Sequence, residues 1–177
     1  MKLVILDRDG VINQESDAYI KTPEEWIPIP GSLAAIGRLT KAGFTVVVAS
    51  NQSGLGRGLF DQKALDAITA RMQAETVKAG GRLDGIYYCP HKPEDGCDCR
   101  KPKTGLFQQI AAHYGVNMRG IPAIGDSARD LVAAKAAVAR PILVKTGRGH
   151  ETLKQMPDAE VYVDLAAAAD HLIGETR

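Results

Sequence analysis

Long apolar runs, a surplus of either charge and a cysteine framework are all missing from this sequence of 177 residues. No apolar run approaches the roughly 20 residues that a membrane-spanning helix needs. The 22 basic residues almost balance the 21 acidic ones, and only 5% of the residues are aromatic. This composition favours neither a basic, aromatic-rich surface for nucleic acid nor attraction to an anionic membrane. We expect no nucleic-acid partner and no membrane partner.

The cysteines are few and clustered. Three are present, all between Cys89 and Cys99, and an odd number argues against a disulfide framework. No basic segment followed by an apolar stretch precedes the first predicted strand. We therefore expect a cytoplasmic protein with reduced thiols. The length suits one buried core, so residues 1–177 are predicted to form a single domain.

Apolar, β-branched segments alternate with amphipathic segments along the chain. The first kind predicts strands at 2–6, 44–49, 83–88, 120–124, 141–145 and 160–163, and the second predicts helices at 31–43, 61–80, 104–115, 127–138 and 165–173. This alternation is typical of the α/β class, with a single doubly wound (Rossmann-like) parallel sheet and helices on both faces. No insertion is large enough for a cap domain.

One long segment, residues 13–30, has no periodic pattern. Its three prolines exclude a continuous helix or a central strand. A loop of this length in a compact chain is usually functional, and this one follows the first strand. Its polar residues are predicted to overhang a site, although a plain surface connector would look the same. These residues are Glu15, Ser16, Asp17 and Tyr19.

Two carboxylates follow the first strand, one residue apart. Asp7 and Asp9 point to the same side if the chain stays extended. Close carboxylates repel each other unless a cation lies between them or one keeps a proton. Alone, the pair would also fit a solvated turn, since Asp and the following Gly10 are common turn residues.

Other strands end in polar residues too, and three of these matter: Ser50, Lys101 and Asp126. The carboxyl ends of parallel strands share one edge of the sheet, so these groups can converge on the aspartates of the first strand. Three carboxylates suit Mg²⁺, which favours a phosphate as a further ligand. A hydroxyl and an ammonium can neutralise phosphoryl oxygens. The pattern predicts a phosphoryl-transfer site.

A second cluster joins all the cysteines to one histidine. Cys89, His91, Cys97 and Cys99 are three thiols and one imidazole, which is a complete tetrahedral zinc set. A closed shell leaves no position for a substrate, so the predicted zinc is structural and pins the loop at 89–99. The alternative, three unrelated thiols beside a surface histidine, does not explain their confinement to eleven residues.

The chain resembles the haloacid dehalogenase-like phosphatases over nearly its whole length. Residues 7–11 match the first motif of that family, Ser50 the second, Lys101 the third and residues 125–130 the fourth. The carboxyl group at position 9 separates phosphatases from the P-type pumps and dehalogenases of the same superfamily.

The resemblance implies a covalent mechanism. Asp7 would attack phosphorus, and Asp9 would protonate the leaving group and then activate water. Mg²⁺ would be held by Asp7, the backbone carbonyl of Asp9, and Asp126, while Ser50 and Lys101 would hold the phosphoryl group.

The zinc loop and the following Arg100 narrow the resemblance. This stretch resembles the corresponding loop of one subgroup of the family, which contains the heptose 1,7-bisphosphate 7-phosphatases and the histidinol-phosphate phosphatases. Of these two activities we expect the first, which belongs to nucleotide-activated heptose biosynthesis. The resemblance also implies a monomer whose substrate is a sugar phosphate. The substrate-binding residues that this resemblance implies are Arg8, Glu15, Ser16, Asp17, Tyr19, Asn51, Gln52, Ser53, Arg100 and Ser127.

Several alternatives stay open at this point. Histidinol phosphate, or another small phosphomonoester, would use the same chemistry, and a DNA 3′-phosphatase is disfavoured by the neutral charge. A phosphosugar-binding regulatory domain would need no catalytic residues. Ser127 stands where some heptose enzymes carry lysine, so the anomer preference is undetermined. Helix capping suffices to explain Asp130, and a surface charge suffices for Arg129.

Overall fold

The computed structural model describes residues 1–177 and contains one parallel sheet of six strands in the order β3-β2-β1-β4-β5-β6. The strands are β1 Leu3–Leu6, β2 Thr45–Asn51, β3 Gly85–Cys89, β4 Pro122–Gly125, β5 Arg140–Val144 and β6 Val161–Tyr162. The α-helices are α1 Ser32–Lys41, α2 Ser53–Gly56, α3 Gln62–Lys78, α4 Gly105–Tyr114, α5 Ala128–Ala136, α6 Gly149–Gln155 and α7 Leu165–Glu175. The predicted fold class is confirmed.

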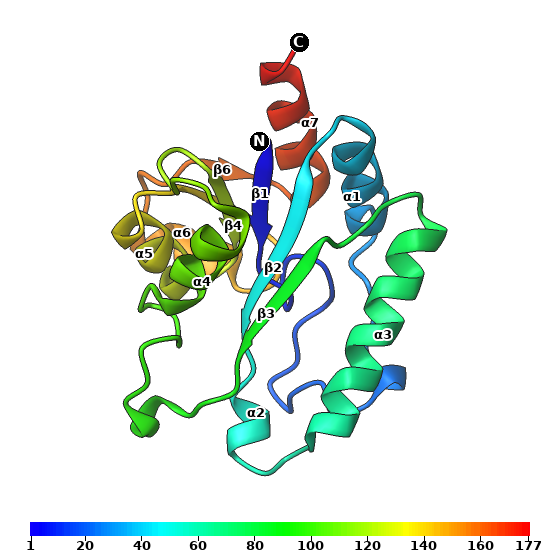
Figure 1. The fold of residues 1–177 in the computed structure, drawn as a ribbon, viewed down its shortest axis with the longest axis vertical. Helices are drawn as coiled ribbons and strands as arrows, with labels where there is room; N and C mark the ends of the chain where they lie inside the picture. Colours follow the sequence, from blue (N-terminus) through cyan, green and yellow to red (C-terminus); the bar gives the residue numbers. More distant parts are fainter.

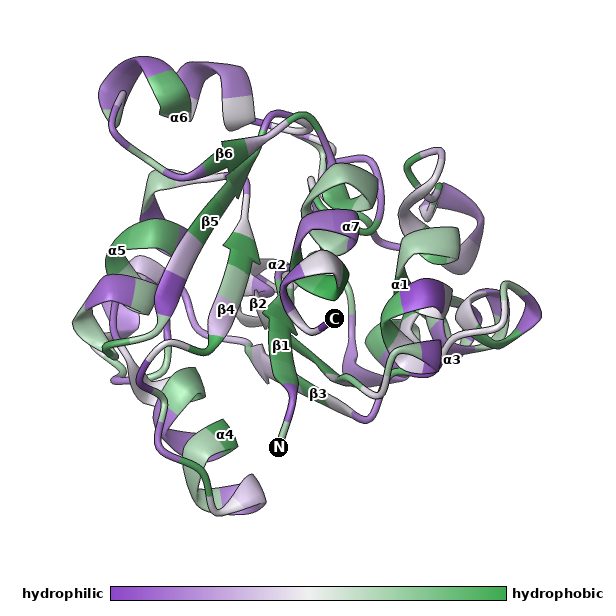
Figure 2. Cartoon of the chain, turned by 90° about the horizontal axis from the view of Figure 1, so that it is seen from above, coloured by the Kyte–Doolittle hydropathy of each residue, from purple (hydrophilic) through white to green (hydrophobic).

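Helices cover both faces of the sheet (Figure 1). Alternate residues of β1 point to opposite faces, so Val4 and Leu6 join one core with residues of α1, α3 and α7. Leu3 and Ile5 join a second core with residues of α4 and α5. Apolar strands in the centre and polar outer segments are visible in Figure 2. A sheet buried on both faces explains the unbroken apolar run of the first strand.

Side-chain caps begin several helices as predicted. The Asp61 carboxylate accepts a hydrogen bond from the Ala64 N–H at 2.8 Å before α3. Ser127 and Asp130 form the predicted capping box of α5. Thr104 precedes α4 but makes no side-chain cap, since its hydroxyl accepts from Gln108 instead.

Two elements near the site differ from the prediction. The helix after β4 ends at Ala136, and Val138 lies beyond it, exposed and at a φ of 64°, instead of on the buried helical face. The stretch around Gly147 and Gly149 is not only a loop, because α6 begins at Gly149. That helix is short and has only two buried residues, so it leaves no apolar period to detect.

The segment 13–30 packs on the domain through a few apolar anchors. Ile20 and Trp26 are buried, and the Arg71 guanidinium lies over the Trp26 ring, 5.7 Å from its centroid. A short 3₁₀ helix, Pro23–Glu25, is its only helical part. No helix of the chain is both long and apolar enough to cross a membrane.

Candidate active site and metal centres

A cavity of about 410 Å³ lies at the carboxyl ends of the strands. Of its 20 lining residues only two are hydrophobic, so it suits a polar ligand. Nearly all the predicted site residues line it: Asp7, Asp9, Glu15, Ser16, Asp17, Tyr19, Ser50, Asn51, Gln52, Ser53, Arg100, Lys101, Asp126 and Ser127. The topology therefore brings together residues that are up to 120 positions apart, from Asp7 to Ser127.

Asp7 lies at the end of β1, beside the central strand β4. Its backbone N–H donates to Ile124 O at 2.9 Å, and its carboxylate accepts from the Arg8 N–H at 2.8 Å. Burial raises the pKa of Asp7 to about 7, and the charge of Asp130 adds to this shift, while Lys101 opposes it. A carboxylate held in this way is exposed to strong repulsion that a cation would relieve.

Lys101 is the buried cation of the site, with only 3% of its surface exposed. Its Nζ lies 2.6 Å from Asp130 Oδ1, 3.3 Å from Asp7 Oδ1 and 2.7 Å from Ala49 O. Burial lowers the pKa of Lys101, but the charges of Asp130 and Asp7 outweigh burial, so that its pKa is raised. The side chain therefore stays an ammonium beside the predicted nucleophile.

Asp126 follows β4 and is fixed from several sides. Its Oδ2 accepts from the Arg148 N–H at 2.9 Å, and its carbonyl accepts from the Thr152 hydroxyl at 2.8 Å. Gly10, at a φ of +86°, lies so close that an added Cβ would be 2.0 Å from Asp126 Oδ2. Burial raises the pKa of Asp126 to about 8, with further contributions from Asp7 and then Asp130.

These carboxylates fit a divalent cation. One oxygen each from Asp7, Asp126 and Asp130 lies within 4.8 Å of the others. Oxygen donors of this kind are the ligands of Mg²⁺. Burial, and then the neighbouring carboxylates, raise the pKa values of Asp7 and Asp126, and a bound cation would favour their ionised forms.

Asp9 is oriented by a buried network. Its carboxylate accepts from Arg8 Nε at 2.8 Å, Asn13 Nδ2 at 2.9 Å and Gln52 Nε2 at 3.1 Å. Burial raises the pKa of Asp9, but the Arg8 charge and these hydrogen bonds outweigh it and lower the pKa. Arg8 is fully buried and lies outside the lining of the cavity. The Arg8 guanidinium instead pairs with the Asp9 carboxylate at 2.8 Å, and its predicted contact with substrate stays a prediction.

The residues of β2 support the same edge of the site. Ser50 and Asn51 belong to the strand itself, one to two residues later than the predicted end. The Ser50 hydroxyl accepts from Gln52 Nε2 at 3.0 Å. Asn51 binds the Lys101 backbone twice, accepting from its N–H and donating to its carbonyl, both at 3.0 Å.

Three cavity arginines were not among the predicted site residues. Arg57, Arg129 and Arg148 all line the cavity. The sequence carries a weak signal for Arg129, because this residue lies within the fourth motif, although a surface charge would look the same. Arg57 and Arg148 lie in glycine-containing stretches after β2 and β5, and their position at the strand ends was the only available signal.

The predicted zinc ligands converge. His91 Nδ1 lies 3.5 Å from Cys89 Sγ and 3.3 Å from Cys99 Sγ, and Cys97 Sγ lies 3.6 Å from Cys89 Sγ. The edges of a tetrahedral zinc site are about 3.5 Å for S–N and about 3.8 Å for S–S. Cys89 and Cys99 are closer, at 2.8 Å, and would separate to admit the ion. All three thiols are free, and the donor set fits zinc.

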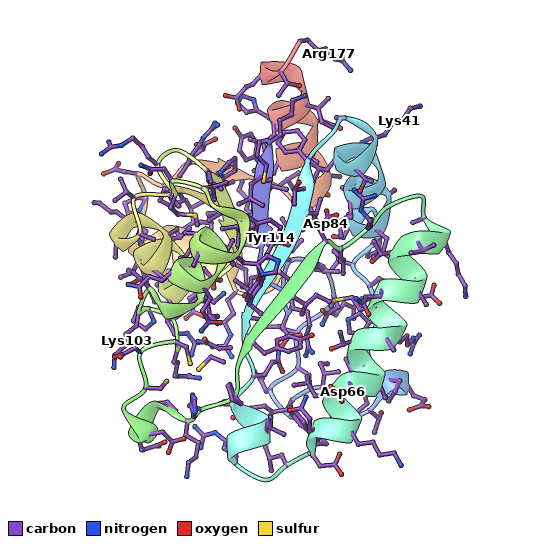
Figure 3. The ribbon with its side chains drawn as sticks, in the orientation of Figure 1. Lys41, Asp66, Asp84, Lys103, Tyr114 and Arg177 are labelled. Carbon is purple, nitrogen blue, oxygen red and sulfur yellow. The ribbon has the colours of Figure 1, made fainter.

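This loop leads directly into the site. Lys103 Nζ donates to Cys97 O at 2.7 Å, and the Gly105 N–H donates to Asp98 O at 3.0 Å. Lys103 projects on the outer side of the loop (Figure 3). Together with the two Asn51 bonds, these contacts fix the backbone around Lys101.

Comparison with known sequences places the chain among phosphatases. A family model described as HAD-hydrolase-like matches residues 98–168. The chain is 55% identical to D-glycero-β-D-manno-heptose-1,7-bisphosphate 7-phosphatase of Bordetella bronchiseptica, over 99% of both chains. The enzyme of the same name from Vibrio cholerae is 39% identical over 82% of both.

Solved structures agree with this placement. D,D-heptose 1,7-bisphosphate phosphatase of B. bronchiseptica, solved in complex with magnesium and phosphate, superposes with a TM-score of 0.96 at 55% identity, over 99% of both chains. The corresponding phosphatase of Burkholderia thailandensis gives a TM-score of 0.78 at 40% identity, over 98% of this chain and 99% of that one. The chain therefore belongs to the D-glycero-β-D-manno-heptose-1,7-bisphosphate 7-phosphatases, a family of haloacid dehalogenase-like hydrolases.

Proposed function

We propose that this protein removes the 7-phosphate of D-glycero-β-D-manno-heptose 1,7-bisphosphate through an aspartyl phosphate on Asp7, with Mg²⁺ as cofactor. The observation that carries the proposal is the position of Asp7, which lies 3.3 Å from the Lys101 ammonium at the floor of a polar cavity. The names of the relatives at 55% identity supply the substrate and its β configuration.

In the first step the Asp7 carboxylate attacks phosphorus and the ester bond to the sugar breaks. Lys101 and the Ser50 hydroxyl bind the phosphoryl oxygens, whose charge is spread in the transition state. Asp130 accepts from Lys101 at 2.6 Å and so keeps the ammonium in place.

Asp9 moves the protons. It lies two residues after the nucleophile and lines the same cavity, and in its protonated form it donates a proton to the leaving oxygen. The ionised Asp9 then takes a proton from the water that hydrolyses the aspartyl phosphate. Its hydrogen bonds to Arg8, Asn13 and Gln52 hold the ionised form, which is the form that the second step requires.

Both metals have assigned residues in this proposal. Asp7, the carbonyl of Asp9, and Asp126 would hold Mg²⁺, which supplies charge stabilisation for the phosphoryl group when bound. Cys89, His91, Cys97 and Cys99 would hold a structural Zn²⁺ that keeps the loop before Lys101 in place. Single-domain organisation over residues 1–177, a monomeric state and a cytoplasmic location stay predictions of the sequence.

Three cations at the cavity favour a bisphosphate over histidinol phosphate. Arg57, Arg100 and Arg129 line it together, and none of them forms an ion pair with a carboxylate. Burial lowers the pKa of Arg100, and the nearby charges of Arg129 and Arg57 lower it further. A second phosphate would relieve this repulsion, whereas the imidazole of histidinol phosphate would not.

The test is a side-by-side assay of phosphate release with Mg²⁺. Substrates are the α and β anomers of the heptose bisphosphate, histidinol phosphate and other small phosphomonoesters. We expect the β anomer to give the highest kcat/KM, with release of one phosphate and retention of the 1-phosphate. Preference for histidinol phosphate would overturn the substrate assignment, and binding of a sugar phosphate without turnover would overturn the enzymatic one.

A further inference from the structure

Arg148 connects two parts of the site that are more than a hundred residues apart. Its backbone N–H donates to Asp126 Oδ2 at 2.9 Å. Its side chain turns the other way, and Nε donates to Glu15 Oε2 at 2.9 Å. A longer contact of 3.9 Å joins the same guanidinium to Asp17. One residue therefore contacts both a candidate metal ligand and the loop that overhangs the cavity.

The backbone of Arg148 is itself fixed. The Thr146 hydroxyl donates to Gly10 O at 2.6 Å, and the Thr152 hydroxyl donates to Asp126 O at 2.8 Å. Gly147 lies so close that an added Cβ would be 2.3 Å from Asp126 Oδ2. The segment around Arg148 is thus anchored on both sides, so its side chain is a fixed point to which a loop can attach.

Between Gln14, whose N–H donates to Ile27 O at 2.8 Å, and the buried Ile20, the loop that carries Glu15 has few other polar anchors. Asp17 is almost completely exposed, and Tyr19 adopts a φ of 66°, which is unusual for a residue with a side chain. Ser16 holds the turn locally, accepting from the Ala18 N–H at 3.2 Å. The Glu15–Arg148 pair is therefore the long-range polar contact that sets where these cavity residues lie.

Charge gives this pair a second effect. Glu15 carries a negative charge, and it lines a cavity that must admit an anion. Arg148 neutralises it. Without the guanidinium, Glu15 would repel a phosphorylated substrate and would be free to turn away from it.

We infer that Arg148 is a positioning residue: it acts through Glu15 to hold residues 15–19 over the cavity, so that the loop contacts the sugar part of the substrate. This role rests on the proposed phosphatase function. It predicts an effect on substrate affinity more than on chemistry, because Arg148 touches neither the nucleophile nor the acid–base group.

Arg148→Met keeps an unbranched side chain close to the length of the arginine stem and removes the guanidinium with its charge. We expect KM for the heptose bisphosphate to rise roughly three- to tenfold, with kcat within about twofold of wild type. Arg148→Lys restores a cation opposite Glu15 and should recover most of the loss. In a Glu15→Gln background, Arg148→Met should change KM no further, because its partner is already neutral.

A second readout needs no substrate. Hydrogen exchange of the amides of residues 14–19 should be faster in Arg148→Met, while amides of the core strands stay protected. The matched control is Arg38→Met, since Arg38 forms an exposed pair of 3.0 Å with Asp170 of α7, and neither residue lines the cavity. That variant should leave both KM and the exchange of residues 14–19 unchanged.

Two results would overturn the role of Arg148. One is unchanged exchange of residues 14–19 in Arg148→Met. The other is an effect on KM that is fully additive with Glu15→Gln. If wild type does not hydrolyse the heptose bisphosphate, the proposed function fails, and the exchange experiment still decides whether Arg148 holds the loop.

Discussion

Lys101 and Asp130 form a buried ion pair in which Nζ lies 2.6 Å from Oδ1. The second carboxylate oxygen of Asp130 accepts the backbone N–H groups of Asp126 and Ser127, both at 3.1 Å. The Asp130 side chain thus connects Lys101 of the third motif to the end of β4, where the candidate Mg²⁺ ligand Asp126 lies. Asp130 caps α5 as predicted. It also holds the Lys101 ammonium and the backbone of Asp126 in place.

Replacing Asp130 should therefore damage activity and stability together. We expect Asp130→Asn to lower kcat roughly 10- to 100-fold, because Lys101 loses its anchor, and to lower the free energy of unfolding by about 3–5 kcal/mol. Phosphate release and urea unfolding measure the two effects. Glu75→Gln breaks an exposed pair with Lys78 of 3.2 Å and should change neither quantity. Full activity in Asp130→Asn would contradict this role.

Asp7→Asn should abolish turnover without unfolding the protein. The amide cannot attack phosphorus, so we expect kcat to fall at least roughly a thousandfold. The melting temperature should not fall, since the substitution removes a buried carboxyl group with a raised pKa of about 7. Phosphate release and thermal unfolding check both points. Normal activity in this variant would exclude Asp7 as the nucleophile.

Gly10 should be intolerant of a side chain for a steric reason. A Cβ there would be 2.0 Å from Asp126 Oδ2, so Gly10→Ala must displace this carboxylate. We expect the Mg²⁺ concentration for half-maximal activity to rise roughly tenfold or more. Gly80 is the matched control, because it has the same φ of +86° and nothing within 4 Å. Gly80→Ala should cost about 1 kcal/mol of stability and leave the Mg²⁺ response unchanged; equal responses in the two variants would refute the steric account.

Zinc should be retained on purification and should matter for activity. Metal analysis of protein prepared without chelators should give about one zinc per chain. Cys97→Ser should lose the metal, lower the melting temperature and reduce kcat, because the loop before Lys101 loosens. Glu94→Gln, an exposed change in the same loop, should do none of these. A zinc-free wild-type protein with full activity would rule out the structural role.

The stabilisation of the folded protein by Mg²⁺ should depend on pH. The pKa values of Asp7 and Asp126 are raised from 3.8 to about 7 and about 8 without the cation. The folded state then binds more protons than the unfolded state, so stability falls as pH rises from about 4 to about 8. Bound Mg²⁺ favours the ionised forms and removes this loss.

Thermal unfolding with and without Mg²⁺ measures that coupling. The gain in melting temperature on adding Mg²⁺ should be larger at about pH 8 than at about pH 5.5. Asp7→Asn has one carboxyl group with a raised pKa fewer. The melting temperature of this variant without metal should therefore depend less on pH than that of wild type. If the gain in melting temperature on adding Mg²⁺ does not change with pH, the raised pKa values of Asp7 and Asp126 are contradicted.

Local patterns were enough to predict the fold class. Apolar runs such as Val4–Leu6 are buried on both faces of a parallel sheet, and that burial leaves an unambiguous signal in the sequence. The motif residues and the spacing of the four zinc ligands likewise lie in short stretches of chain, so the sequence alone pointed to the cavity residues from Asp7 to Ser127.

The contacts that the arginines make were decided only by the tertiary structure. Arg8 follows the nucleophile in sequence, yet it is fully buried against Asp9, whereas Arg148 lies far along the chain and reaches Glu15. A guanidinium on a long stem can serve as a buried counter-ion, a surface charge or a ligand contact. Which of these applies depends on carboxylates that are distant in sequence, and their distances from the arginine are fixed only when the chain has folded.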